Sequence, residues 1–183
     1  MKRVGVFIDE LNVRFRLREC RWTELYDVGH FARSLAGPRD LVSVTFCHPP
    51  PVREQLGDRR YATERSYLET VRKDPAVTVP EGPYMTKRTR DGVTIWLEKQ
   101  TDVLLASEML HQSATKVIDV AILATADADL VPAMRRANDL GVKVELLRFR
   151  GAVPRIFELD RVASSTLRAR PSSFVPYTKR IAR

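Results

Sequence analysis

Cysteine and histidine are scarce in this sequence, and their scarcity excludes several classes of site. The chain has 183 residues, of which two are cysteines (Cys20 and Cys47) and three are histidines. Neither cysteine stands in a CxxC or a Cys/His ligand spacing, so the sequence predicts no zinc site. Two cysteines cannot form a disulfide scaffold either, and we expect buried free thiols.

Long hydrophobic runs are also lacking. The apolar run within the N-terminal MKRVGVFIDE ends at an acid and is too short for a signal peptide. No other stretch approaches the roughly 20 apolar residues of a membrane-spanning helix. We therefore expect a cytoplasmic protein with no membrane partner.

Basic charge, in contrast, is plentiful. Lys and Arg number 31 against 23 Asp and Glu, which gives a formal net charge of +8. Such a surplus attracts anionic partners, and the guanidinium fork matches phosphate oxygens. The sequence therefore favours nucleic acid as a partner, although a solvated face better explains any single arginine. The basic residues in question are Arg14, Arg16, Arg18, Arg21, Arg53, Arg59, Arg60, Arg65, Arg72, Lys87, Arg88, Arg90 and Lys99.

Short apolar runs alternate with periodic, charged segments along the chain. Runs rich in Val, Ile and Leu are typical of buried parallel strands. The alternation predicts α/β architecture with a mostly parallel sheet. We assign one domain to residues 1–167 and a basic tail containing Pro and Ser to residues 168–183. Strands are predicted at residues 4–8, 41–46, 76–79, 117–124 and 142–147, and helices at residues 27–35, 52–73, 101–112, 129–140 and 154–159.

One segment departs from this alternation. Asp91-Gly92 lies between the β-like runs 84–87 and 93–97, which is a strong signal for a β-hairpin. We interpret the hairpin as an insertion in the domain. Tyr84 and Trp96 lie in it close to basic residues, and exposed aromatics can stack on unpaired bases. A tryptophan is more often part of a core, however.

Acidic residues follow the ends of two predicted strands. Asp9 comes directly after the first strand, and Asp127 and Asp129 come just after the strand at residues 117–124. Ligands of an open parallel sheet bind beyond the carboxyl ends of its strands, at the switch point in strand order. Asp102, at the start of the helix after the hairpin, supplies a third carboxylate that can reach this edge.

Clustered carboxylates at one edge imply a cation. They repel one another and their pKa values rise unless a positive charge neutralises them. Hard oxygen ligands select Mg²⁺, Mn²⁺ or Ca²⁺, and a basic chain with such a site suggests metal-assisted phosphodiester hydrolysis. The alternative for each acid alone is that it caps the following helix.

Three segments of the chain together carry a further signal. They are residues 7–12 (FIDELN), 98–103 (EKQTDV) and 123–132 (LATADADLVP), followed by GVKVE at residues 141–145. These segments resemble, in order, the signature blocks of the NYN domain family, with its LabA-like or DUF88 branch as the closer match. That family is similar to PIN-domain nucleases. The resemblance implies a Rossmann-like three-layer α/β/α fold and a divalent-metal ribonuclease site.

The resemblance also assigns roles to residues. It implies Asp9, Asp102 and Asp127 as ligands of Mg²⁺ or Mn²⁺, and these three with Asp129 as the catalytic acids. Asn12 matches the family's polar partner. Glu108 stands where the family often has an aspartate, and we interpret it as a peripheral acid. The family usually has Gly or Ser in place of Glu10, and Gly in place of Ala126.

Three residues are expected on the substrate side of this site. Asn12 is expected to position substrate or an acid, Lys99 to hold a phosphate, and the Thr125 hydroxyl to hold a carboxylate or water. RNA is the expected substrate, and a homodimer is left open. Two alternatives remain: an inactive NYN fold that binds RNA or protein, and a metal-dependent phosphatase acting on a small substrate.

Overall fold

The structure is a computed structural model that describes residues 1–149 and 162–177. Its central element is a parallel sheet of six strands. In chain order the elements are β1 (Arg3–Asp9), α1 (Glu10–Glu19), α2 (Val28–Ala36), β2 (Asp40–Cys47), α3 (Arg53–Leu56), α4 (Asp58–Val71), β3 (Val77–Thr78), β4 (Tyr84–Arg88), β5 (Thr94–Glu98), α5 (Thr101–Ala114), β6 (Val120–Ala124), a 3-10 turn (Ala128–Leu130), α6 (Val131–Asp139), β7 (Lys143–Arg148), β8 (Ser165–Arg168) and a second 3-10 turn (Pro171–Ser173). The strand order is β3-β2-β1-β6-β7-β8, and all neighbours in it are parallel. β4 and β5 pair only with each other, antiparallel.

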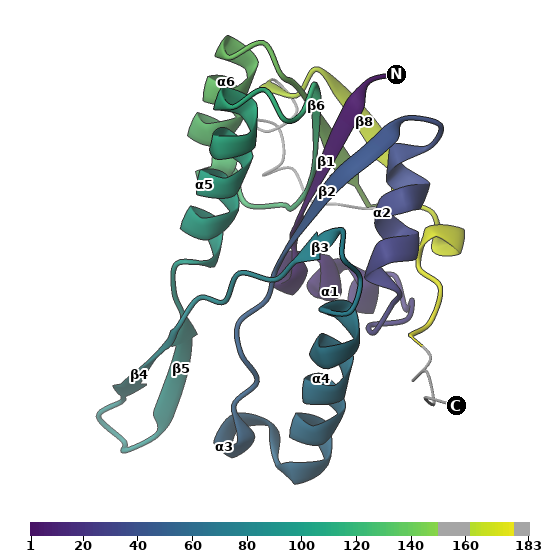
Figure 1. The fold of residues 1–183 in the computed structure, drawn as a ribbon. Coiled ribbons are helices and arrows are strands. Elements are labelled where there is room, and N and C mark those ends of the chain that lie inside the picture. Colours follow the sequence, from purple (N-terminus) through teal and green to yellow (C-terminus); the bar gives the residue numbers. More distant parts are fainter. Residues whose placement is uncertain (150–161, 178–183) are drawn as a thin grey trace.

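Helices cover both faces of the sheet (Figure 1). Val4, Val6 and Ile8 of β1 pack with α1, α2 and α4 in one hydrophobic cluster. Phe7 points the other way and packs with α5 and α6 in a second cluster. The alternation arises because successive side chains of a strand face opposite sides of the sheet. The prediction of a three-layer α/β/α fold with a separate hairpin is confirmed.

Helix α5 approaches the sheet closely at Gly5. A Cβ atom there would lie 3.0 Å from the Ile118 Cγ2 atom and 3.1 Å from the Gln112 Oε1 atom. Gln112 also accepts a hydrogen bond from Ser43 of β2 at 2.6 Å and donates one to Glu108 at 2.8 Å. Glu108 thus belongs to the contact between α5 and the sheet.

Several observed elements differ from the predicted ones. The single helix expected at residues 52–73 is broken at Gly57, whose φ of 73° is disfavoured for other residues, into α3 and α4. Strand β8 was not predicted, because it is short and mostly exposed at the sheet edge. The helix expected at residues 154–159 lies outside the described residues.

The first part of the predicted tail contacts the domain. Phe174 is buried and its ring lies 4.5 Å from that of Phe31, centroid to centroid. Tyr177 packs against the same cluster, and residues 178–183 lie outside the described part. Within residues 1–149 and 162–177, no helix combines the length and the apolar character needed to cross a membrane.

Candidate active site

The centre of the sheet is where its strand order reverses. β2 and β3 lie to one side of β1, whereas β6, β7 and β8 lie to the other. Since ligands of such sheets bind beyond the carboxyl ends of the strands at the reversal, the crevice between β1 and β6 is the expected site. Asp9 is the last residue of β1, and Thr125 follows the last residue of β6.

Asp9 is held by donors from both sides of this crevice. Its Oδ1 atom accepts a hydrogen bond from the backbone N–H of Asn12 at 3.2 Å, which makes Asp9 the N-cap of α1. Its Oδ2 atom accepts from the Asn12 amide at 2.5 Å and from the Thr125 hydroxyl at 2.8 Å. The residue is 3% exposed. Asn12 and Thr125 therefore fix the Asp9 carboxylate rather than reaching outward from it.

Asp127 approaches the same point from the end of β6. Its backbone N–H donates to the Thr125 hydroxyl at 3.1 Å, so that one hydroxyl links it to Asp9. Its own Oδ1 atom accepts from the backbone N–H of Asp129 at 2.9 Å and caps the 3-10 turn. Asp127 is half-buried, and Asp129 is exposed. We call Asp9 and Asp127, with Asn12 and Thr125, the acid pair site.

The acid pair site concentrates negative charge. Burial raises the pKa of Asp9, and the neighbouring Asp127 adds to the rise, whereas hydrogen bonds from Thr125 and Asn12 oppose it. Among the described side chains, no Lys, Arg or His forms an ion pair with either aspartate. A buried carboxylate is stabilised by a cation, so the charge here favours binding of a cation from solution.

The oxygen donors fit a hard divalent cation. Mg²⁺ is commonly held by one or two carboxylates, with waters and substrate phosphate completing its octahedron. Within the described residues, no three or more His, Cys, Asp and Glu side chains gather closely enough to hold a metal ion. Asp9 and Asp127 therefore form the acidic centre, and the half-buried Asp102, in the first turn of α5, does not complete a three-acid group.

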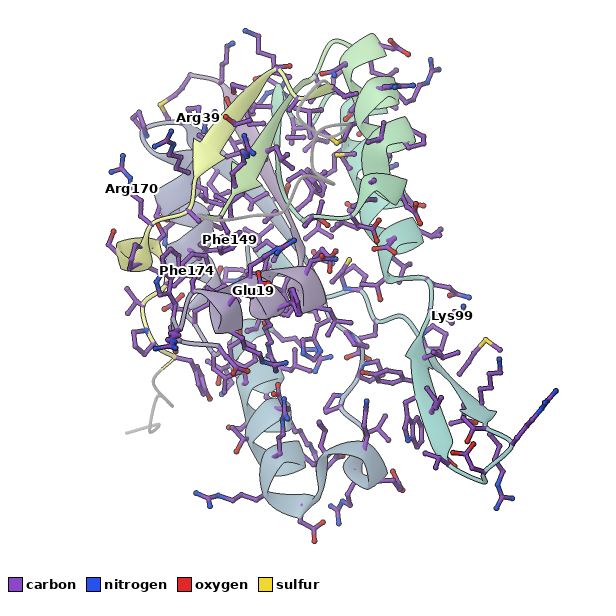
Figure 2. The ribbon with its side chains drawn as sticks, turned by 180° about the vertical axis from the view of Figure 1, so that it is seen from behind. Glu19, Arg39, Lys99, Phe149, Arg170 and Phe174 are labelled. Carbon is purple, nitrogen blue, oxygen red and sulfur yellow. The ribbon has the colours of Figure 1, made fainter. Side chains whose placement is uncertain are left out.

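The other predicted residues lie around this centre. Lys99 is exposed where the hairpin joins α5, and Figure 2 labels it there. Its backbone N–H donates to the Pro83 carbonyl at 3.1 Å. The structure thus brings Asp9, Asn12, Thr125 and Asp127 into one hydrogen-bonded set, with Asp129 joined through its backbone.

A second group of charged residues, which the sequence did not predict, lies beside the first. Glu10 accepts hydrogen bonds from Arg14 and from the Tyr26 hydroxyl, each at 2.6 Å. Arg14 also donates to both carboxylate oxygens of Glu64, on α4, at 2.7 and 2.8 Å. The His48 Nε2 atom lies 3.9 Å from the Glu64 Oε2 atom. We call these five residues the buried ion cluster, since every one of them is buried.

The buried ion cluster shows that Arg14 is neither on a solvated face, as expected of any single arginine, nor placed to contact a phosphate. Arg14 is only 5% exposed and its charge is taken up by two glutamates. Burial raises the pKa of Glu10 to about 7, against the lowering effect of Arg14. Burial lowers the pKa of His48 to about 3, helped by Arg14. The i,i+4 spacing of Glu10 and Arg14 was the only signal in the sequence, and it also suits an exposed helix pair.

Comparisons with known proteins show the family and the fold of the chain. The model of the NYN domain, a nuclease-like fold, matches residues 3–168. A crystal structure of a protein of unknown function from Vibrio parahaemolyticus superposes with a TM-score of 0.67, at 19% identity, over 94% of this chain and 95% of that one. That likeness shows the fold alone.

One curated relative is named as an enzyme of another class, a monooxygenase. The 6-hydroxy-3-succinoylpyridine 3-monooxygenase of Pseudomonas putida is 30% identical over 112 residues. The match covers 60% of this chain and 36% of the relative, so this chain spans only about a third of that protein's length.

Proposed function

Because the chain belongs to the NYN domain family, we propose that it is a divalent-metal-dependent ribonuclease that hydrolyses RNA phosphodiester bonds at the acid pair site. Asp9 and Asp127 bind Mg²⁺ or Mn²⁺, and Asp102 contributes from α5 when substrate and metal are present. Asp129 is exposed beside them and orients water. Lys99 holds a substrate phosphate.

A single observation carries this proposal. Asp9 is a buried carboxylate with a raised pKa and a second carboxylate beside it, and no described cationic side chain pairs with it. Holding a buried carboxylate without a positive charge is unfavourable for folding. A bound metal ion and a substrate phosphate would offset this cost, and perturbed carboxylates of this kind are typical of functional sites.

The residues of the chain divide the work. Asn12 and Thr125 orient the Asp9 carboxylate through three hydrogen bonds, so that its position does not depend on the metal. The Thr125 hydroxyl holds the Asp127 backbone at the same time. A bound divalent cation supplies charge neutralisation at the phosphate and lowers the pKa of water. The net charge of +8 draws the polyanion to the site.

The test compares cleavage of labelled single-stranded RNA by matched variants. Wild type with Mn²⁺ or Mg²⁺ is expected to cleave, and both EDTA and the double variant Asp9→Asn/Asp127→Asn are expected to abolish cleavage. Asp139→Asn is the control, because it removes an exposed carboxylate at the end of α6. Asp102→Asn measures the contribution of the third acid separately.

Other outcomes would overturn the proposal. RNA binding without turnover under any divalent metal would identify a binding module that keeps the fold. Hydrolysis of mononucleotides with intact oligonucleotides would identify a phosphatase. Cleavage that survives in the double variant would remove the acid pair site from the mechanism.

A further inference from the structure

The β4–β5 hairpin extends away from the body of the molecule. Figures 1 and 2 show it, from opposite sides, projecting at the end of the molecule where α5 begins. Neither hydrophobic cluster among the described residues includes a side chain of β4 or β5. An isolated two-stranded hairpin is marginally stable in water, so this one gains from a bound partner.

The base of the hairpin is fixed against α5. Gly82 is buried there, and a Cβ atom on it would lie 2.2 Å from the Lys99 carbonyl oxygen. The backbone hydrogen bond from Lys99 to Pro83 closes the same end. Two residues later α5 begins, with Asp102 in its first turn. A strand held by the hairpin is therefore delivered next to α5 and the edge that carries the acid pair site.

Two aromatic side chains lie on one face of the hairpin. Tyr84 pairs with Glu98 and Thr86 with Trp96, so alternation puts Tyr84, Thr86 and Trp96 on the same side. The Tyr84 and Trp96 rings lie 6.2 Å apart, centroid to centroid, at 85°. Both residues are half-buried, and neither is part of the core. Trp96 is thus a surface residue of the hairpin.

The cations of the hairpin are available to a ligand. With the side chains that the structure describes, none of Lys87, Arg88, Arg90 and Lys99 forms an ion pair. On the helices, by comparison, Arg16, Arg18 and Arg65 each pair with a glutamate. Charge that the fold has not neutralised complements a polyanion.

We propose that the hairpin binds unpaired nucleotides of a single-stranded RNA, with a base stacked on Tyr84 and Trp96 and the adjacent phosphates held by Arg88, on the same face, and Arg90, in the turn. Bases within a duplex do not expose a face for stacking, so the hairpin selects single strands. This proposal rests on the proposed function only for the step in which the bound strand reaches the acid pair site.

The test measures binding without cleavage. The protein carries Asp9→Asn, EDTA is present, and Trp22→Phe leaves Trp96 as the only tryptophan of the two in the chain. A labelled oligoribonucleotide is titrated as a single strand and as a duplex. We expect the single strand to quench Trp96 fluorescence and to bind more tightly than the duplex.

Variants of both hairpin faces locate the contact. Trp96→Leu is expected to weaken single-strand binding at least about fivefold, the loss of one stacked base, whereas Trp96→Phe keeps most of it. Ile95→Thr is the matched control, because Ile95 lies on the opposite face and is 41% exposed. Replacing Arg88 and Arg90 by Gln should flatten the slope of log affinity against log salt by about 0.7 per lost phosphate contact.

Three results would overturn the proposal. The first is equal affinity for single strand and duplex, and the second is unchanged binding in Trp96→Leu. The third is a dimer, seen by sedimentation, that Ile95→Thr dissociates while Trp96→Leu leaves RNA binding intact, since the partner would then be a second copy of the chain. If binding behaves as expected but wild type never cleaves, the proposed function fails and this proposal stands.

Discussion

Asp9 and Glu10 are adjacent in the chain and about equally buried, at 3% and 0% exposed, yet their carboxylates meet opposite surroundings. Glu10 accepts from a guanidinium and a phenol in the buried ion cluster. Asp9 accepts only from an amide, a hydroxyl and a backbone N–H, with a second carboxylate nearby. One carboxylate is neutralised within the fold, whereas no described cationic side chain forms an ion pair with the other.

The difference separates structural charge from functional charge. The buried ion cluster joins α1 to α4 through Arg14 and Glu64, and its chemistry is complete without a ligand. In the acid pair site, hydrogen bonds fix the positions of the carboxylates, but no described cationic side chain neutralises their charge. Burial alone therefore does not distinguish the two acids, whereas the presence or absence of an internal counter-charge does.

The largest effect is expected from removing the cation of the buried ion cluster. Arg14→Met leaves Glu10 and Glu64 buried without a counter-charge and should lower the free energy of unfolding by about 3–5 kcal/mol, measured by urea denaturation. Arg65→Met is the control, because Arg65 pairs with Glu69 on an exposed helix surface and should change stability little. Equal effects of the two variants would show that the buried ion pairs stabilise the protein no more than the exposed one.

Metal binding should stabilise the acid pair site by a smaller amount. Mn²⁺ at 100 times its dissociation constant is expected to raise the free energy of unfolding of wild type by about 2.7 kcal/mol. In Asp9→Asn this gain should disappear, while Asp139→Asn keeps it. Thermal denaturation with and without EDTA measures both, independently of any activity. A gain that persists in Asp9→Asn would place the metal elsewhere.

Removing the shared hydroxyl should weaken metal binding less than removing an acid does. Thr125→Val takes a donor from Asp9 and an acceptor from the Asp127 backbone. We expect about tenfold weaker Mn²⁺ affinity, measured by calorimetry. Thr125→Ser retains the hydroxyl and should restore most of the affinity. If valine and serine behave alike, the hydroxyl does not position the acids.

The smallest effect concerns acid sensitivity in the buried ion cluster. The pKa of His48 is lowered to about 3, so the unfolded chain takes up its proton first as the pH falls below about 6.5. Its contribution to stability is complete above that pH and is lost as the pH falls towards 3. Relative to His48→Gln, wild type should lose about 1 kcal/mol of stability between pH 7 and 5.5, because the opposite contribution of Glu10, whose pKa is raised to about 7, is common to both proteins. Denaturation curves that shift equally in wild type and variant would exclude this role.

The sequence predicted the central part of the fold because local signals and tertiary structure agree there. Val4 to Ile8 and Val120 to Ala124 are apolar because both faces of these strands are covered. Because β1 and β6 are neighbours in the sheet and end at the same edge, Asp9 and Asp127 lie close together. β8 escaped prediction since an exposed edge strand need not be apolar. Gly57 was overlooked because the charge pattern continues unchanged across the break.

The buried ion cluster could not be predicted from the sequence for a different reason. Arg14 looks like its neighbours Arg16 and Arg18, and its second partner, Glu64, lies 50 positions further along the chain. Only the packing of α4 beside α1 decides which of these arginines is buried. Asn12 and Thr125, by contrast, were expected to hold substrate, water or an acid, and in the structure both donate hydrogen bonds to the Asp9 carboxylate.

Gly5 of β1 contacts the end of α5 opposite to Asp102. The glycine lets Gln112 of α5, and Ile118 in the segment after α5, pack closely against β1, and a side chain at this position would crowd both. α5 is a helix of 14 residues with Asp102 in its first turn. A displacement of Gln112, near the end of α5, would shift the helix as a whole and with it Asp102. Gly5→Ala would therefore alter the position of Asp102 from the far end of the helix, without changing any residue of the acid pair site.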